Sequence, residues 1–104
     1  MNEIIQKMFP TGTLNGRGGT EVNGLTKGTV PAGTILKSGQ DKFDNKGRRE
    51  FYAVELDGHV AYLRVCEAYP GSGYDEFAVI HRVVKAEETE EVNEILNTVS
   101  RMTS

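Results

Sequence analysis

The dipeptide Asp57-Gly58 constrains the fold of this chain more than any other feature, because it separates two runs of alternating side chains. The first run is Phe51–Leu56 (FYAVEL), and the second is His59–Cys66 (HVAYLRVC). An Asp-Gly pair between such runs is a strong signal of a β-hairpin, since both turn positions must tolerate a positive φ. The sequence therefore predicts an antiparallel hairpin near the middle of the chain.

Short runs separated by glycine and proline surround this hairpin, and they are typical of strands and turns. The segment Thr11–Phe43 contains several such runs, with a turn at Pro31-Ala32-Gly33. Polar loops span Asp41–Arg49 and Tyr69–Asp75, and Glu76–Lys85 (EFAVIHRVVK) has the pattern of a further strand. The middle of the chain is therefore expected to be mainly β.

Helical spacing appears at the start of the chain, at Ile4, Ile5 and Met8. It predicts a helix of at most two turns over Asn2–Phe9, which Pro10 ends. The same segment carries an acidic residue and lacks the long apolar region of a signal peptide. No stretch of the sequence is apolar for long enough to cross a bilayer. We therefore expect no membrane association and a cytoplasmic location, which is the host cytoplasm if a phage encodes the chain.

A second helix is predicted between Glu87 and Arg101, where acidic residues stand at the start and a basic residue near the end, as the helix dipole favours. Apolar side chains recur there at positions i, i+3, i+4 and i+7. They are Val92, Ile95, Leu96 and Val99. Such a stripe predicts an amphipathic helix that packs on the strands as core; an oligomer or partner interface is the alternative.

The chain has 104 residues and is expected to form one domain, since two pieces would be too small to bury separate cores. Within residues 1–104 the strands occupy 13–85 and the terminal helix 87–101. The formal net charge is −3, which gives no basic surface for nucleic acid phosphates. Nucleic acid is therefore not an expected partner.

Glycine makes up six of the residues in Leu14–Thr34 (LNGRGGTEVNGLTKGTVPAGT), which raises the question of a phosphate-binding loop. Such a loop needs its glycines between a strand and a helix, with a Lys-Ser/Thr pair or a following βαβ unit. No helical pattern follows Gly33. The glycines are therefore interpreted as turn and bulge positions of a tightly curved small barrel.

Several motifs occur in an order known from one family. The segment Leu14–Gly19 (LNGRGG) is followed by Lys27-Gly28-Thr29, and later come Phe51–Leu56, the Asp57-Gly58 turn and Tyr62. Over about residues 13–69 this order resembles a bacterial Src-homology-three domain. The resemblance implies a small antiparallel Src-homology-three-like β-barrel, here with a short N-terminal helix and a C-terminal amphipathic helix.

Catalysis has one candidate, the thiol of Cys66 with a histidine as its base. His59 lies an odd number of positions away on the same predicted strand, so the two side chains project to opposite faces. His81 lies on another strand and can approach Cys66, yet a cysteine in an alternating apolar strand is more often a small core residue. We therefore expect no enzymatic activity.

The same residues argue against a metal site or a disulfide. The two histidines have no partners at the spacing of zinc ligands, so we expect neither a metal nor a cofactor. Cys66 is the single cysteine and has no partner in the chain for a disulfide, which fits a reducing compartment.

Binding is the favoured function, because tyrosine offers a large contact area with a polar tip. Tyr69 and Tyr74 flank a glycine-rich loop, where packing does not explain an aromatic ring, whereas Tyr52 has the alternation of a core residue. Charged neighbours would add complementarity to a partner. The predicted partner-binding residues are Tyr62, Tyr69, Tyr74, Asp75, Glu76, Arg48 and Arg49.

A short acidic chain without enzyme motifs is similar to small phage or mobile-element proteins that inhibit a host or defence protein by occupying its surface. A protein partner is therefore expected. One alternative is a virion component, since Val30–Leu36 (VPAGTIL) resembles turns of phage head-decoration proteins. The other is a small ligand held near Tyr69–Tyr74, and an oligomer formed through the C-terminal helix is also left open.

Overall fold

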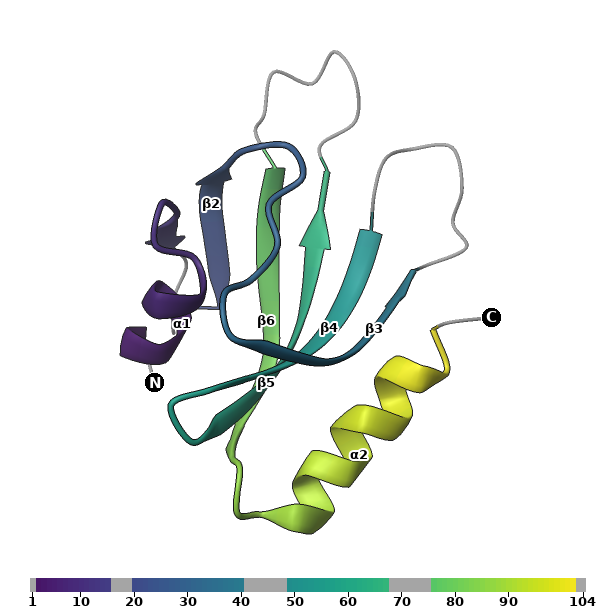
Figure 1. Ribbon diagram of the computed structural model, residues 1–104. Helices are drawn as coiled ribbons and strands as arrows, with labels where there is room; N and C mark the ends of the chain where they lie inside the picture. The colour runs from purple at the N-terminus through teal and green to yellow at the C-terminus, as the bar shows by residue number, and fades with distance from the viewer. Residues whose placement is uncertain (1, 16–19, 41–48, 68–75, 103–104) are drawn as a thin grey trace.

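The computed structural model describes residues 2–15, 20–40, 49–67 and 76–102 (Figure 1). These residues form two helices and six strands. In chain order the elements are α1 (Asn2–Met8), β1 (Thr13–Asn15), β2 (Glu21–Leu25), β3 (Thr34–Gln40), β4 (Arg49–Leu56), β5 (His59–Cys66), β6 (Glu76–Lys85) and α2 (Thr89–Ser100).

The six strands of the described residues belong to one antiparallel sheet in the order β1-β2-β6-β5-β4-β3. The sheet is not closed, because β1 and β3 lie at its two edges. The mainly β class with one helix near each end of the chain is therefore confirmed. A barrel of the Src-homology-three type stays a prediction.

The predicted hairpin is formed by β4 and β5, which pair without interruption. Arg49 lies opposite Cys66 at one end of this ladder, and Leu56 lies opposite His59 at the other. The turn residues Asp57 and Gly58 have φ angles of 49° and 75°. Both angles are positive, which is the reason that a two-residue hairpin of this kind selects Asp-Gly.

One face of the sheet, here called the inner face, is covered by α1 and by residues 26–33, which cross it on their way from β2 to β3 (Figure 1). Ile5 and Met8 of α1 are each 1% exposed. The backbone N–H of Ala32 donates to the carbonyl of Met8 at 2.9 Å, and a Cβ on Gly33 would lie 2.7 Å from the carbonyl of Glu55. The crossing segment therefore lies against both α1 and the sheet, and the apolar side chains beneath it are closed off from water.

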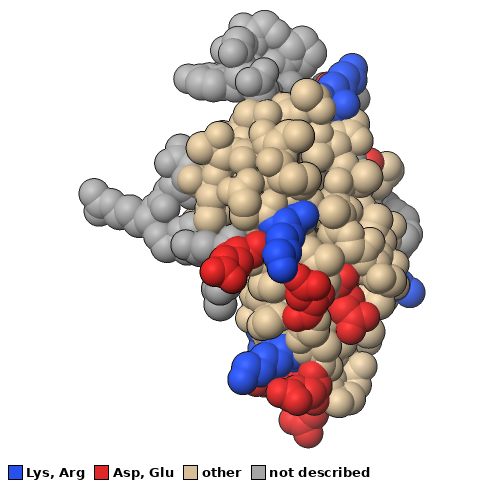
Figure 2. Space-filling view, turned by 60° about the vertical axis from the view of Figure 1, so that its left-hand side comes forward, with Lys and Arg blue, Asp and Glu red and all other residues tan. Residues whose placement is uncertain are grey.

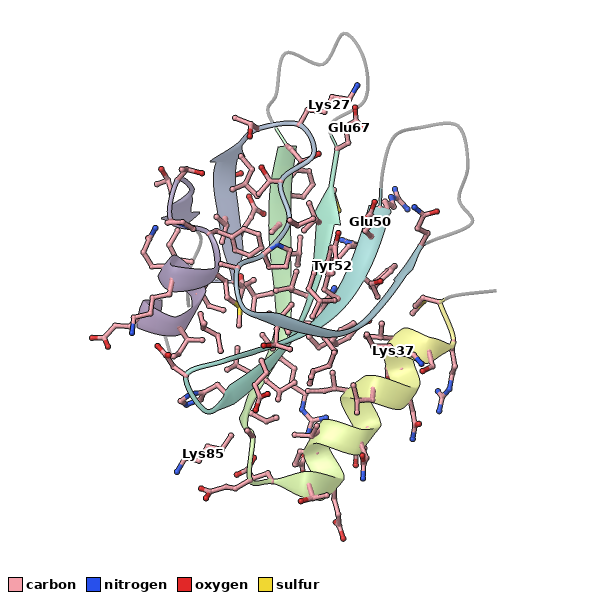
Figure 3. All side chains as sticks on the ribbon, viewed as in Figure 1. Lys27, Lys37, Glu50, Tyr52, Glu67 and Lys85 are labelled. Carbon is pink, nitrogen blue, oxygen red and sulfur yellow. The ribbon has the colours of Figure 1, made fainter. Side chains whose placement is uncertain are left out.

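Tyr52 is a buried inner-face residue whose hydroxyl has a hydrogen-bond partner. The residue is 3% exposed, which confirms its predicted place in the core. Its hydroxyl donates a hydrogen bond to the carboxylate of Glu50, which lies two positions earlier on β4 and therefore on the same face (Figure 3). The ring is thus buried while its oxygen keeps a partner.

The opposite face, here called the outer face, is covered in part by α2. Ile95 and Val99 are buried there, against a cluster that includes Phe51, Ala53, Val60 and Val84 of the sheet. Gly39 of β3 permits the close approach of the helix, since a Cβ at this position would lie 3.0 Å from the carbonyl of Val99. The interpretation of the C-terminal apolar stripe as core is therefore confirmed.

Charged side chains join elements to one another. Arg82 of β6 forms ion pairs with Glu91 and Glu94 of α2, and Lys7 of α1 lies 2.7 Å from the carboxylate of Asp57 in the hairpin turn. Figure 2 shows acidic and basic side chains side by side on one face of the molecule, below an area without charge. Neither helix of the described residues is long and apolar enough to cross a membrane.

Candidate binding surface

Next to α2, the outer face carries four side chains that we call the outer-face cluster: Phe51, Tyr62, Arg64 and His81. Alternation along β5 places Tyr62 and Arg64 on the same face of the sheet. Phe51 of β4 lies directly opposite Arg64, and β6 contributes His81. Three neighbouring strands therefore build the cluster, and their ladders hold its backbone in place.

The β5–β6 ladder has an irregularity at His81. In the β5–β6 ladder Leu63 lies opposite Ile80 and Tyr62 lies opposite Arg82, which leaves His81 as an extra residue between the two pairs. A bulge of this kind turns a side chain away from strict alternation and is common beside binding sites. His81 follows the inner-face residue Ile80, so alternation places its imidazole ring on the outer face, where it stacks against Tyr62. The bulge places the next residue, Arg82, on that face as well.

The three rings of the cluster stack on one another. The centroids of Tyr62 and His81 are 4.8 Å apart with 28° between the ring planes. Phe51 lies 6.2 Å from Tyr62 and 6.4 Å from His81, again nearly parallel. Phe51 is buried, Tyr62 is half-buried and His81 is exposed. The stack therefore runs from the core under α2 to the solvent.

Arg64 places a permanent positive charge beside these rings. Its side chain is half-buried, and its Nε is buried without a hydrogen-bond partner among the described residues. A buried donor without an acceptor costs about 1–3 kcal/mol. Nε itself has no surface open to an outside acceptor, but the positive charge of the half-buried side chain favours an anionic or carbonyl oxygen beside it.

The electrostatic state of the cluster follows from burial and from Arg64. His81 is exposed as a residue, but neighbouring rings shield part of its imidazole, and this partial burial lowers the pKa of His81; the nearby charge of Arg64 lowers it further. Burial raises the pKa of Tyr62, although Arg64 opposes this change. At neutral pH both rings are therefore uncharged, and the cluster carries the single positive charge of Arg64.

The register of the sheet argues against a Cys66–His81 pair. Cys66 lies opposite Phe77, which precedes His81 by four residues on β6, so the two residues are separated by about 13 Å along the strands. Burial also raises the pKa of the Cys66 thiol, although Arg64 opposes this by charge and by a hydrogen bond. A buried thiol with a raised pKa has the character of a core residue rather than a nucleophile.

A metal site has no support from the same region. Within the described residues, no group of three His, Cys, Asp or Glu side chains is arranged to hold a metal ion. The ring of His81 stacks against those of Tyr62 and Phe51.

The structure places the predicted partner-binding residues in different environments. Tyr62 belongs to the outer-face cluster, and Arg49 is exposed at the start of β4, opposite Cys66. Glu76 is 4% exposed, and its carboxylate accepts the backbone N–H of Thr29 at 3.1 Å and of Gly28 at 3.4 Å. Four of the predicted residues lie outside the described part of the chain. They are Arg48, Tyr69, Tyr74 and Asp75.

Glu76 therefore has a structural role. Its carboxylate holds the turn at residues 26–29 against the start of β6. From that turn the chain crosses the inner face. Sequence reasoning missed Phe51, Arg64 and His81 as members of a surface cluster. The available signal was Arg64 itself, because a charged residue within an otherwise alternating apolar strand marks a change in what its face contacts.

Comparisons of the chain with protein-family models, with curated proteins and with solved structures give no match. The class of protein is therefore the one that the structure defines: a small mainly β domain with one antiparallel sheet, two helices and an aromatic and cationic cluster on the outer face of the sheet. An argument about function must begin from that cluster.

Proposed function

We propose that this protein is a non-enzymatic binding module that recognises another protein through the outer-face cluster. The observation that carries the proposal is the half-buried, positively charged side chain of Arg64 beside three stacked rings on one face of the sheet. Arginine and aromatic residues dominate the energetic centres of protein interfaces. Their position on paired strands adds rigidity, which lowers the entropy cost of binding.

The cluster also has the layout of such a centre. Phe51 anchors the stack in the core, Tyr62 lies at the boundary, and His81 offers an uncharged ring face to the partner. Arg64 supplies a positive charge, which favours a carboxylate or a backbone carbonyl of the partner beside it. The partner surface is therefore one with an exposed apolar or aromatic group next to an oxygen acceptor.

The origin and setting of the protein form the finer part of the proposal. The resemblance to a bacterial Src-homology-three domain over about residues 13–69, the small size and the absence of enzyme motifs in the sequence support a phage or mobile-element protein. Its partner is then a host or defence protein in the host cytoplasm, which it inhibits by covering the partner's surface.

A pull-down with a matched control tests the proposal. Tagged wild-type protein, the double variant Arg64→Met/His81→Ala and the control Lys85→Ala/Glu90→Ala are incubated with lysate of the host cells. The control changes two exposed residues outside the cluster. Equal melting temperatures establish that all three are folded, and mass spectrometry identifies what each retains.

We expect wild type and control to retain one partner in stoichiometric amount and the cluster variant to lose it. A partner retained equally by all three would remove the outer-face cluster from the proposal. If no partner is retained by any of them, protein binding itself is contradicted. Migration of the protein with virus particles would then favour the virion alternative, and its absence would favour a small ligand.

A further inference from the structure

The two edges of the sheet differ in length and exposure. β1 has three residues, whereas β3 has seven, and all of the β3 residues except Gly39 are exposed. No strand among the described residues pairs with the outer side of β3 (Figure 1). β3 is therefore a long edge whose backbone is open to an additional strand.

The β3 edge offers both hydrogen bonds and apolar contacts. In an antiparallel ladder alternate residues direct their N–H and C=O groups toward the neighbouring strand, so the others direct theirs to the open side. Ile35 and Leu36, which are 43% and 38% exposed, are two of the three exposed large hydrophobic side chains in the described chain. A register shift between Ile35 and Lys37 displaces them from strict alternation. Such an edge fits an extended peptide better than a folded surface.

Lys37 determines which strand can be added. It is the central residue of β3, so two copies of β3 paired antiparallel over their full length would place Lys37 directly opposite its own equivalent. Like charges directly opposite one another destabilise a strand pair, and a lysine on an edge is a common protection against self-association. Lys37 is exposed, and Figure 3 shows it beside α2.

We infer that the outer edge of β3 binds an extended segment of a partner protein that carries an acidic residue opposite Lys37. The backbone of the partner supplies the ladder hydrogen bonds, its acidic residue pairs with the lysine, and its apolar residues contact Ile35 and Leu36. This inference names the chemistry of a protein partner, as the proposed function does, but it uses a surface that does not include Arg64 or His81.

A peptide selection tests the inference on the full chain. A library of random linear peptides is selected on wild-type protein, and the affinities of the selected peptides are measured for wild type, Lys37→Glu and the control Lys85→Glu. Lys85 is an exposed lysine at the end of β6 and gives the same change of charge (Figure 3). Amide hydrogen exchange measured by NMR then locates the bound peptide.

We expect the selected peptides to share an acidic residue within a β-forming sequence and to protect alternate amides of β3 from exchange. Lys37→Glu is expected to weaken binding by roughly three- to tenfold, because an attractive cross-strand pair becomes a repulsive one, while Lys85→Glu leaves it unchanged. Arg64→Met/His81→Ala is expected to bind the peptides as wild type does, which separates this inference from the outer-face cluster.

Four results would overturn the inference. The first is a selection without binders, and the second is protection only at amides outside β3. The third is equal affinity for Lys37→Glu and wild type. The fourth is a wild-type dimer in sedimentation whose interface protects β3, because the edge would then accept a second copy rather than a foreign strand.

Discussion

The inner and outer faces of the sheet are built from the same strands and differ in what covers them. On β5, Leu63 contributes to an apolar inner face that α1 and residues 26–33 close, and its neighbour Arg64 points to the outer face next to α2. The inner face excludes water from its side chains almost completely, whereas the outer face leaves an imidazole and a guanidinium within reach of a partner. The difference indicates that the inner face supplies stability, and we propose that the outer face serves recognition.

Leu63→Ala is expected to have the largest effect on stability. Leu63 is fully buried on the inner face, and removal of its side chain leaves a cavity that costs about 2–5 kcal/mol of unfolding free energy. Urea denaturation followed by circular dichroism measures this loss.

Arg64→Met is the matched control, because it replaces a side chain of similar length at the next position. It is expected to change the unfolding free energy by less than about 1 kcal/mol, since the apolar stem is retained and the buried Nε without a partner is removed. An equal loss for the two variants would show that the faces do not divide stability and recognition as proposed.

Leu96→Asp tests the part of the outer face that α2 covers. Leu96 is half-buried against the outer-face core, so a carboxylate there is expected to lose about 2–3 kcal/mol from lost apolar contact and from desolvation. The melting temperature is the measurement, and Asn97→Asp, an exposed position on α2, is the control of equal charge. An unchanged melting temperature together with lost self-association would instead make this stripe an interface.

Gly39→Ala is expected to have a smaller effect at the same junction. The new Cβ would lie 3.0 Å from the carbonyl of Val99, so β3 and α2 must separate slightly, at a cost of about 1 kcal/mol. Ser38→Ala, at the adjacent exposed position, controls for the change in strand propensity. Equal stability of the two variants would mean that α2 shifts without cost and is held loosely on the outer face.

Features that depend on neighbouring residues could be predicted from the sequence. Asp57-Gly58 determines a hairpin because its positive φ angles are a local property, and the stripe of α2 is visible from helical periodicity alone. The strand Glu76–Lys85 was also predicted, because a long run of alternating side chains is typical of a β-strand.

Features that depend on distant partners could not be predicted in the same way. Glu76 follows a polar loop, so its charge indicated an exposed residue, but its carboxylate binds backbone N–H groups almost fifty residues earlier in the chain. The bulge at His81 arises from the register between two strands, and one strand's sequence does not specify it. The candidate site was therefore predicted at Tyr62 and missed at the residues that tertiary pairing brings beside it.

The smallest expected effect is the pH dependence of the unfolding free energy that His81 causes. It tests the outer face, since His81 lies there. Its pKa lies below the usual 6.5 because the folded state disfavours the charged ring. Above pH 6.5 the ring is neutral in both states and contributes nothing. As the pH falls from 6.5 toward the lowered pKa, the unfolded state binds the proton first, so stability decreases. His81→Gln should remove this decrease. The difference between the stability profiles of wild type and His81→Gln over pH separates the contribution of His81 from that of the carboxylates.

The same titration reports on recognition, because Arg64 contributes to the lowered pKa of His81. An NMR titration of Arg64→Met should show a His81 pKa closer to 6.5 but still below it, since burial, the larger cause, remains. A partner carboxylate bound to Arg64 would offset the same positive charge and shift the pKa in the same direction. If the pKa of His81 is identical in wild type and Arg64→Met, the two side chains are not electrostatically coupled, and His81 cannot report on what binds Arg64.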